Sequence, residues 1–135
     1  MKTEISVLLL HGQNDSLGAL IMALENQALR VRWLRNCKDA GPLLQGANPP
    51  HLVFTATTLP DGTWEDVFNL TLKAAKAVNV IVTARVVDVR LYLDTIVRGA
   101  FDFIVPPLTG SELAHVVRCA AENVMSRREA QPSPA

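Results

Sequence analysis

The chain has 135 residues, the length of one ordinary domain, and 49% of them are hydrophobic while 19% are charged. That much apolar surface excludes a disordered protein, because it is enough to form a core. Thirteen Lys and Arg balance thirteen Asp and Glu, so the chain lacks the broad positive charge of a non-specific nucleic-acid-binding protein. No apolar run approaches the roughly 20 residues of a membrane span, and the first residues do not form a signal peptide. We therefore expect a soluble domain of the cytoplasm that binds neither nucleic acid nor membranes.

Five short apolar runs predict strands. They lie at residues 5–10, 29–34, 51–56, 78–83 and 101–105. The first run is almost wholly apolar, as expected of a strand that is buried on both faces. The second run alternates between polar and apolar residues, which is typical of an edge strand with one wetter face.

Helical patterns separate these runs and follow the last one. Helices are predicted from Asp15 or Ser16, over 36–45, over 64–76, over 88–98 and from Thr109 onward. Pro42 lies inside the second helix, so we expect that helix to be short or to restart there, because proline in a helix interior costs roughly 3 kcal/mol. Two pairs have the spacing of a capping box, Thr63 with Asp66 and Thr109 with Glu112. Gly99 is a natural residue after the end of the fourth helix.

The last helix is predicted to bury one apolar stripe, consisting of Leu113, Val116, Val117, Ala120 and Val124. The residues after it lack large apolar side chains and include two prolines. We therefore expect one domain over residues 1–128 and a disordered tail or linker over 129–135.

Strands that alternate with helices predict an α/β fold, a doubly wound parallel sheet with helices on both faces. In such folds the functional residues lie beyond the carboxyl ends of the strands. The residues of interest therefore follow Leu10, Phe54, Val82 and Val105.

The order and spacing of these segments resemble the receiver domain of bacterial response regulators, a CheY-like fold, over about residues 4–128. Four segments carry the resemblance: the strand at 7–10, Leu-Pro-Asp-Gly at 59–62, Val-Thr-Ala at 82–84, and Gly-Ala-Phe-Asp-Phe-Ile-Val at 99–105 before Pro107. The resemblance implies a flavodoxin-like sandwich of three layers, with five strands in the order 2-1-3-4-5 and five helices.

The residues that receiver domains use for phosphotransfer are replaced in this sequence. The resemblance implies that His11 and Gly12 stand where two carboxylates hold Mg²⁺, that Ala56 stands in place of the phosphoacceptor aspartate, and that Pro106 stands in place of a lysine. Mg²⁺ prefers oxygen ligands, and a methyl group cannot act as a nucleophile. We therefore expect no bound Mg²⁺ or other cofactor, no catalytic residue, and no enzyme activity.

Three further positions match the family. Thr83 and Phe103 occupy its switch positions, and Pro107 occupies the position that commonly follows a cis peptide bond. With no phosphoryl group to follow, Thr83 is interpreted as a hydroxyl that bonds to the backbone.

Other polar residues have simpler explanations. Asp15 and Asp61 approaching His11 would form a weak cation site, but a loop histidine and a helix-capping aspartate account for the same sequence. Cys37 and Cys119 are too few and too far apart for a disulfide framework or a zinc pattern, so buried thiols are expected.

The helix at 88–98 and the residues before it carry more apolar side chains than one face can bury. They are Val86, Val87, Val89, Leu91, Tyr92, Leu93, Ile96 and Val97. An apolar excess often marks a partner site, and receiver domains use the face of helix four, strand five and helix five for dimers or targets. On this face we place Arg90, Leu91, Asp94, Arg98, Asp102 and Arg118. The alternative is an ordinary solvated helix surface.

These observations predict an atypical receiver domain in two-component signal transduction that acts by protein–protein contact without aspartyl phosphorylation. Its partner would be a signalling kinase, an output domain or a second copy of the chain, the last forming a homodimer through the same face. The alternative is a module that binds a small ligand in the crevice left by Gly12, Ala56 and Pro106.

Overall fold

The computed structural model of the chain describes residues 4–10, 29–106 and 108–131. In this part of the chain no helix is both long and apolar enough to cross a bilayer.

Five parallel strands form the central sheet. They are β1 (Ile5–Leu10), β2 (Leu29–Leu34), β3 (Leu52–Ala56), β6 (Asn79–Thr83) and β7 (Asp102–Ile104). Their spatial order is β2-β1-β3-β6-β7, and every neighbouring pair is parallel. Counted along the chain, this is the predicted order 2-1-3-4-5, which is therefore confirmed.

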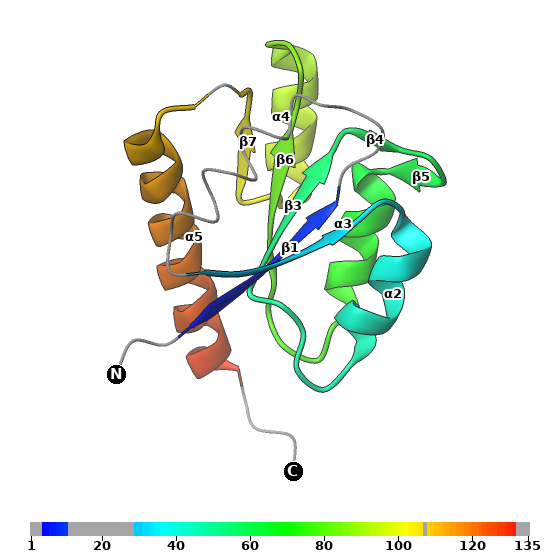
Figure 1. The fold of residues 1–135 in the computed structure, drawn as a ribbon, viewed down its shortest axis with the longest axis vertical. Helices are drawn as coiled ribbons and strands as arrows, with labels where there is room; N and C mark the ends of the chain where they lie inside the picture. The colour runs from blue at the N-terminus through cyan, green and yellow to red at the C-terminus, as the bar shows by residue number, and fades with distance from the viewer. Residues whose placement is uncertain (1–3, 11–28, 107, 132–135) are drawn as a thin grey trace.

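Helices cover both faces of the sheet (Figure 1). The described residues contain α2 (Cys37–Gln45), α3 (Trp64–Leu72), α4 (Val89–Arg98) and α5 (Gly110–Ala130). Figure 1 shows α5 on one side of the sheet and α2 with α3 on the other. The described residues thus hold four helices rather than five, and the helix predicted from Asp15 or Ser16 lies outside them.

The core is divided by the sheet into layers. Beneath α5, the cluster of buried side chains includes Val7, Leu9, Leu52, Phe54, Ile81, Ile104, Leu113, Val117, Ala120 and Val124. On the other face, one cluster (Leu8, Leu10, Ala40, Leu44, Val53, Leu59, Val67 and Val78) lies beneath α2 and α3, and another (Trp64, Val80, Val82 and Ala100) lies toward α4. Alternate residues of β1 point to opposite faces, so its apolar run is buried on both.

The helix α2 does not restart at Pro42 but continues through it from Cys37 to Gln45, and at nine residues it is short, which was the other form of the expectation. The first turn of α2 is capped, because the side chain of Asn36 accepts a hydrogen bond from the backbone nitrogen of Asp39 at 2.9 Å. The helix also buries Ala40 and Leu44 completely. Packing of this face and capping of the first turn offset the cost of the proline.

The segment after β3 contains the residues Leu-Pro-Asp-Gly at 59–62. Residues 58–63 form a small hairpin of β4 (Thr58–Leu59) and β5 (Gly62–Thr63), which runs straight into α3. The capping box of Thr63 and Asp66 is confirmed. However, α3 ends at Leu72, four residues before the predicted end, because the chain must turn back into β6.

The last helix extends two residues into the segment expected to be tail, ending at Ala130. Its final turn is tied to the body of the protein. The Arg128 side chain donates to the carbonyls of Pro49, Pro50 and Ala77, and Gln131 accepts from the Ala77 nitrogen at 2.9 Å. These long-range contacts have no signature in the local sequence.

Candidate functional site

The carboxyl ends of β3, β6 and β7 lie side by side. Ala56 pairs in register with Thr83, and Thr83 pairs with Ile104. The sheet therefore brings the two predicted site residues, Ala56 and Thr83, together at one edge. Ala56 is half-buried and presents only a methyl group there.

The hydroxyl groups at this edge are engaged with the backbone. Thr83 is 5% exposed, and its Oγ1 donates to the carbonyl of Thr55 at 3.2 Å. The Oγ1 of Thr55, which is fully buried, donates to the carbonyl of Ala56 at 3.0 Å. The interpretation of Thr83 as a backbone-bonded hydroxyl is confirmed, and neither hydroxyl has a general base beside it among the described residues.

Phe103 packs toward α4 rather than toward this edge. Its ring lies 5.8 Å from that of Tyr92 at an interplanar angle of 84°, an edge-to-face contact. Pro106 is half-buried two residues after the end of β7. The other predicted site residues, His11, Gly12 and Pro107, lie outside the described residues, as does Asp15.

Asp61 is used for capping rather than for a cation site. Its two carboxylate oxygens accept hydrogen bonds from the backbone nitrogens of Cys37 at 2.8 Å and Lys38 at 3.0 Å. These two hydrogen bonds lower the pKa of the Asp61 carboxyl, and the bond from Cys37 has the larger effect. No local pattern predicts the bonds of Asp61 to α2, because the two segments are brought together only by the fold.

The surroundings of the Cys37 thiol disfavour its ionised, reactive form. Burial, followed by the charges of Asp61 and Asp66, raises the pKa of Cys37 to about 11. Both Cys37 and Cys119 are half-buried and free, whereas full burial was expected. In the part of the chain that the structure describes, no group of three His, Cys, Asp or Glu side chains is placed to hold a metal ion.

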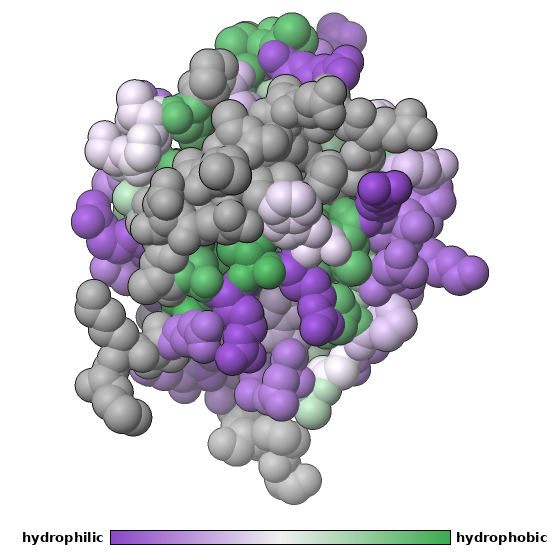
Figure 2. All heavy atoms as spheres, viewed as in Figure 1, coloured by the Kyte–Doolittle hydropathy of each residue, from purple (hydrophilic) through white to green (hydrophobic). Residues whose placement is uncertain are grey.

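Most of the apolar side chains of α4 lie in solvent rather than in the core. Its only buried residue is Thr95, whose hydroxyl donates to the carbonyl of Tyr92. The exposed apolar side chains on and just before α4 are Val86, Val87, Val89, Tyr92, Leu93 and Val97, which are between 43% and 83% exposed. Figure 2 shows hydrophobic atoms at the top of the molecule, the end at which Figure 1 places α4. The predicted apolar excess is therefore real and lies in solvent.

The charged residues assigned to this face do not all lie on it. Arg98 turns toward α3, where it pairs with Glu65 at 3.3 Å and lies 6.0 Å from the centre of the Trp64 ring. Asp102 accepts a hydrogen bond from the nitrogen of its own neighbour. The remaining members are Arg90 and Asp94, both exposed, Leu91, which is half-buried, and Arg118, which contacts His115.

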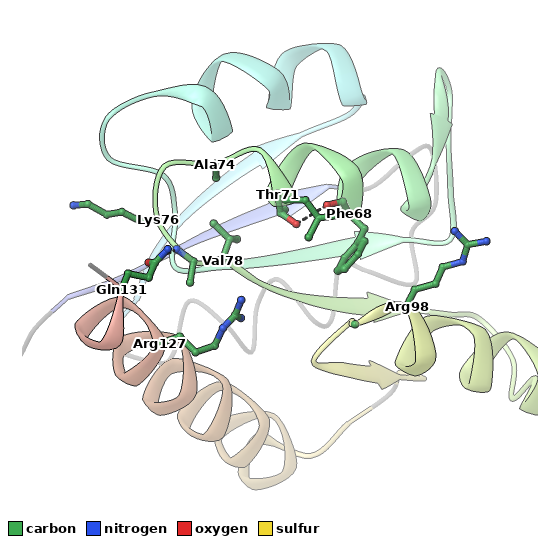
Figure 3. Close-up of a pocket in the computed structure, with 11 residues that line it drawn as sticks. Phe68, Thr71, Ala74, Lys76, Val78, Arg98, Arg127 and Gln131 are labelled. Carbon is green, nitrogen blue, oxygen red and sulfur yellow. Dashed lines mark hydrogen bonds between the residues drawn. The ribbon is translucent and has the colours of Figure 1, made fainter. Parts of the chain in front are cut away.

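A hollow of about 340 Å³ lies at the opposite end of the sheet, where α3, α4 and α5 end (Figure 3). Its lining includes Lys76, Arg98 and Arg127, but Arg98 is paired with Glu65 and Arg127 donates to Asn79. The carbonyl ends of three helices converge on the same region and oppose binding of an anion. We assign no function to this hollow.

The fold can be compared with known structures. The chain matches the signal receiver domain of an HD domain-containing protein from Pseudomonas fluorescens with a TM-score of 0.82 and 22% identity, covering 97% of this chain and 96% of that one. It matches the non-phosphorylated HemR receiver domain from Leptospira biflexa with a TM-score of 0.71 and 21% identity, covering 98% and 99%. A two-component response regulator from Clostridium difficile gives 0.73 and 20%, covering 88% and 97%.

The chain has the receiver fold. At the level of sequence, no family model and no curated protein matches it. The structural likeness extends over nearly the whole chain, so the receiver fold accounts for every described element of the sheet and its covering helices.

Proposed function

We propose that this receiver fold is an atypical signalling module of a two-component system that acts through protein–protein contact and is not phosphorylated on aspartate. The observation that carries the proposal is Ala56 at the end of β3, in register with Thr83. In a receiver domain that position needs a carboxylate to accept a phosphoryl group, and a methyl group cannot form the acyl phosphate.

The surroundings of Ala56 support the same conclusion. Pro106 has no ammonium group to balance phosphoryl charge, and the Thr83 hydroxyl is held by a backbone carbonyl. Asp61, the acidic residue of the nearby hairpin, has both carboxylate oxygens bonded to α2. We therefore propose no Mg²⁺ site, no other cofactor and no enzyme activity, and we place the module in the cytoplasm with its signalling partners.

The exposed stripe of α4 supports contact with another protein. Val89, Leu93 and Val97 follow one another at intervals of four residues, so they lie on one side of the helix. Arg90 and Asp94 lie along one side of this stripe with opposite charges, and a polar rim of this kind borders the apolar centre of many interfaces. The partner is a signalling kinase, an output domain or a second copy of the chain, and a homodimer would use α4 with β7 and α5.

The absence of phosphotransfer can be tested with a small-molecule phosphodonor. The protein is incubated with acetyl phosphate and Mg²⁺ beside a receiver domain that has the full set of acidic residues, and intact masses are measured. We expect the control to gain one phosphoryl group and this protein to gain none. A gain of one phosphoryl group that hydroxylamine removes, as it removes an acyl phosphate, would overturn the proposal.

The interface is tested by placing a charge on the stripe. Leu93→Glu should abolish self-association measured by light scattering over a range of concentrations. Leu72→Glu is the matched control, because Leu72 is an exposed leucine on α3, at 67% against 54% for Leu93. If the unaltered protein is a strict monomer at every concentration, the homodimer is wrong and the stripe must serve a different protein.

Three hollows lined by described residues lie between α2 and α3, beside β2, and at the far end of the sheet. None of the three is lined by Ala56, so none of them supports the small-ligand alternative.

A further inference from the structure

In the described part of the chain, β2 lies at the edge of the sheet and carries two exposed arginines. Among the described residues its only strand partner is β1. Arg30 and Arg32 are both exposed, and the residue between them, Val31, is half-buried. An open edge offers unpaired backbone groups to any extended segment that reaches it.

The backbone groups of β2 that face away from the sheet can be identified from the hydrogen bonds of β1. The Ser6 carbonyl accepts from the nitrogen of His51, on the β3 side. Because the backbone groups of a strand alternate between its two sides, Ser6 and Leu8 bond toward β3 while Val7 bonds toward β2. Val7 is in register with Val31, so the backbone groups of Arg30 and Arg32 reach β1. The N–H and C=O of Val31 therefore point away from the sheet.

The two arginine side chains share one face of the sheet. Arg30 is in register with Ser6 and Arg32 with Leu8, and Leu8 belongs to the core beneath α2. Beside them lies a groove of about 370 Å³. It is lined by Ser6, Val7, Leu8, Arg30, Val31, Arg32, Leu43, Asn48 and Pro50, so its lining holds two cations and no carboxylate.

The arginines are available for an acidic partner. Arg30 pairs with Glu4 at 3.2 Å, but the two side chains are 73% and 55% exposed, so this ion pair is weak and easily exchanged. The side chain of Arg32 has no hydrogen bond or ion pair with any described residue. Pairing of β2 with a second copy would bring arginines against arginines, which is unfavourable.

We propose that the outer edge of β2 binds an extended acidic peptide by strand addition. The backbone of Val31 forms the hydrogen bonds, and carboxylates at alternate positions of the peptide face Arg30 and Arg32 across the groove. Arg30 and Arg32 are two residues apart, and side chains two residues apart in an extended peptide also lie on one face. Two carboxylates of the peptide can therefore face the two arginines while its backbone bonds to β2. This site lies at the sheet edge opposite β7 and α4, and it does not depend on the function proposed above.

The test uses a synthetic probe, acetyl-Thr-Glu-Val-Glu-Val-Thr-amide, and the same peptide with both Glu replaced by Gln. Binding to the isotope-labelled protein is followed by the amide resonances of β2 and of the groove. We expect the acidic peptide to shift them at saturable concentrations, the Gln peptide to bind about tenfold more weakly or not at all, and salt to weaken the acidic peptide.

Three variants separate strand addition from simple charge attraction. Val31→Pro removes the outward N–H and leaves the bonds to β1 intact, so affinity should fall by about tenfold, whereas Val31→Thr should bind normally. Arg32→Glu should abolish binding, and Arg35→Glu, a matched exposed arginine beyond the strand, should change it by less than about twofold.

Melting temperatures establish that each variant is folded. The proposal is overturned if the acidic peptide shifts no β2 resonance, in which case Arg30 and Arg32 only protect the edge from aggregation. It is also overturned if Arg32→Glu and Arg35→Glu weaken binding equally, or if folded Val31→Pro binds as well as Val31→Thr. None of these outcomes bears on α4 or on phosphorylation, so the two proposals fail separately.

Discussion

The carboxylate of Asp61 lies 2.8 Å from the backbone nitrogen of Cys37, which ties the hairpin after β3 to the first turn of α2. The second carboxylate oxygen accepts a hydrogen bond from the backbone nitrogen of Lys38. The side chain of Asn36 accepts one from the backbone nitrogen of Asp39. Two side chains therefore satisfy three of the amides that every helix leaves unpaired at its start. This external capping is one reason why α2 persists through Pro42.

Replacing Asp61 should destabilise the protein at neutral pH. Because the pKa of Asp61 is lower in the folded protein than its ordinary value of 3.8, the ionised carboxylate stabilises the fold above that value. The stabilisation is lost as the pH falls through the lower, folded pKa. Asp61→Asn should melt a few degrees below the unaltered protein near pH 7, and the difference should shrink as the pH falls below 3.8.

Thermal melts at several pH values check this prediction. Asp94→Asn is the control, since Asp94 is exposed on α4 and bonds to no described residue. If the Asp61→Asn difference persisted unchanged at about pH 2, the carboxylate charge would not be its cause.

The thiol of Cys37 should react slowly with alkylating reagents. A pKa of about 11 in place of 9.0 leaves about a hundredfold less thiolate near neutral pH, and the higher intrinsic nucleophilicity of that thiolate recovers about tenfold. We expect iodoacetamide to modify Cys37 about tenfold more slowly than a cysteine in a short peptide.

Mass spectrometry of digests gives the rate at each cysteine. Asp61→Asn should accelerate the reaction at Cys37, because it removes a negative charge that raises the pKa. A rate at Cys37 equal to that of the peptide would mean that the thiol is neither buried nor beside a carboxylate in solution.

The parts of this fold that the sequence predicts are those with a local physical cause. The strand at Ile5–Leu10 follows from an apolar run, the start of α3 from the capping box of Thr63 and Asp66, and the end of α4 from Gly99. Contacts between distant segments are not predictable in this way. Neither the bonds of Asp61 to α2 nor those of Arg128 to three carbonyls have a pattern in the residues near them.

The candidate site likewise has parts that the sequence predicts and parts that depend on contacts between distant segments. Ala56 and Thr83 could be placed together because parallel strands end at a common edge, and the hydroxyl of Thr83 bonds to the backbone as expected. The direction of Arg98 could not be predicted, because helix periodicity alone does not say which neighbour a flanking arginine will reach. Here Glu65 and the Trp64 ring attract it to α3.

Gly99 should not tolerate alanine. Its φ of 116° lies in the left-handed region, and an added Cβ would stand 3.0 Å from Cζ of Phe68. Gly99→Ala should lower the free energy of unfolding by about 1–2 kcal/mol. Gly110→Ala is the matched control, because that glycine begins α5 with open space around it and should be neutral or stabilising by about 0.5 kcal/mol. Chemical denaturation measures both, and equal effects would contradict the backbone argument.

Arg128 should be the arginine on α5 whose loss costs most. Its guanidinium donates to the carbonyls of Ala77 at 2.8 Å, Pro50 at 2.8 Å and Pro49 at 3.2 Å. Arg128→Met leaves these acceptors without a donor and should cost about 2 kcal/mol, measured by denaturation. Arg118→Met, at an exposed position whose contact is His115, should cost less than about 0.5 kcal/mol.

The same substitution should change the titration of His51. Burial, then the charges of Arg128 and Lys76, lower the pKa of His51 below its ordinary 6.5, and its Nδ1 accepts a hydrogen bond from the nitrogen of Ser6 at 3.0 Å. The folded protein therefore favours neutral His51, and stability is lost as the pH falls from about 6.5 toward the lower folded value. Removing the neighbouring charge in Arg128→Met should raise the His51 pKa and reduce this loss. Nuclear magnetic resonance of the imidazole gives the pKa directly, and an unchanged value would show that the charge of Arg128 does not contribute to it.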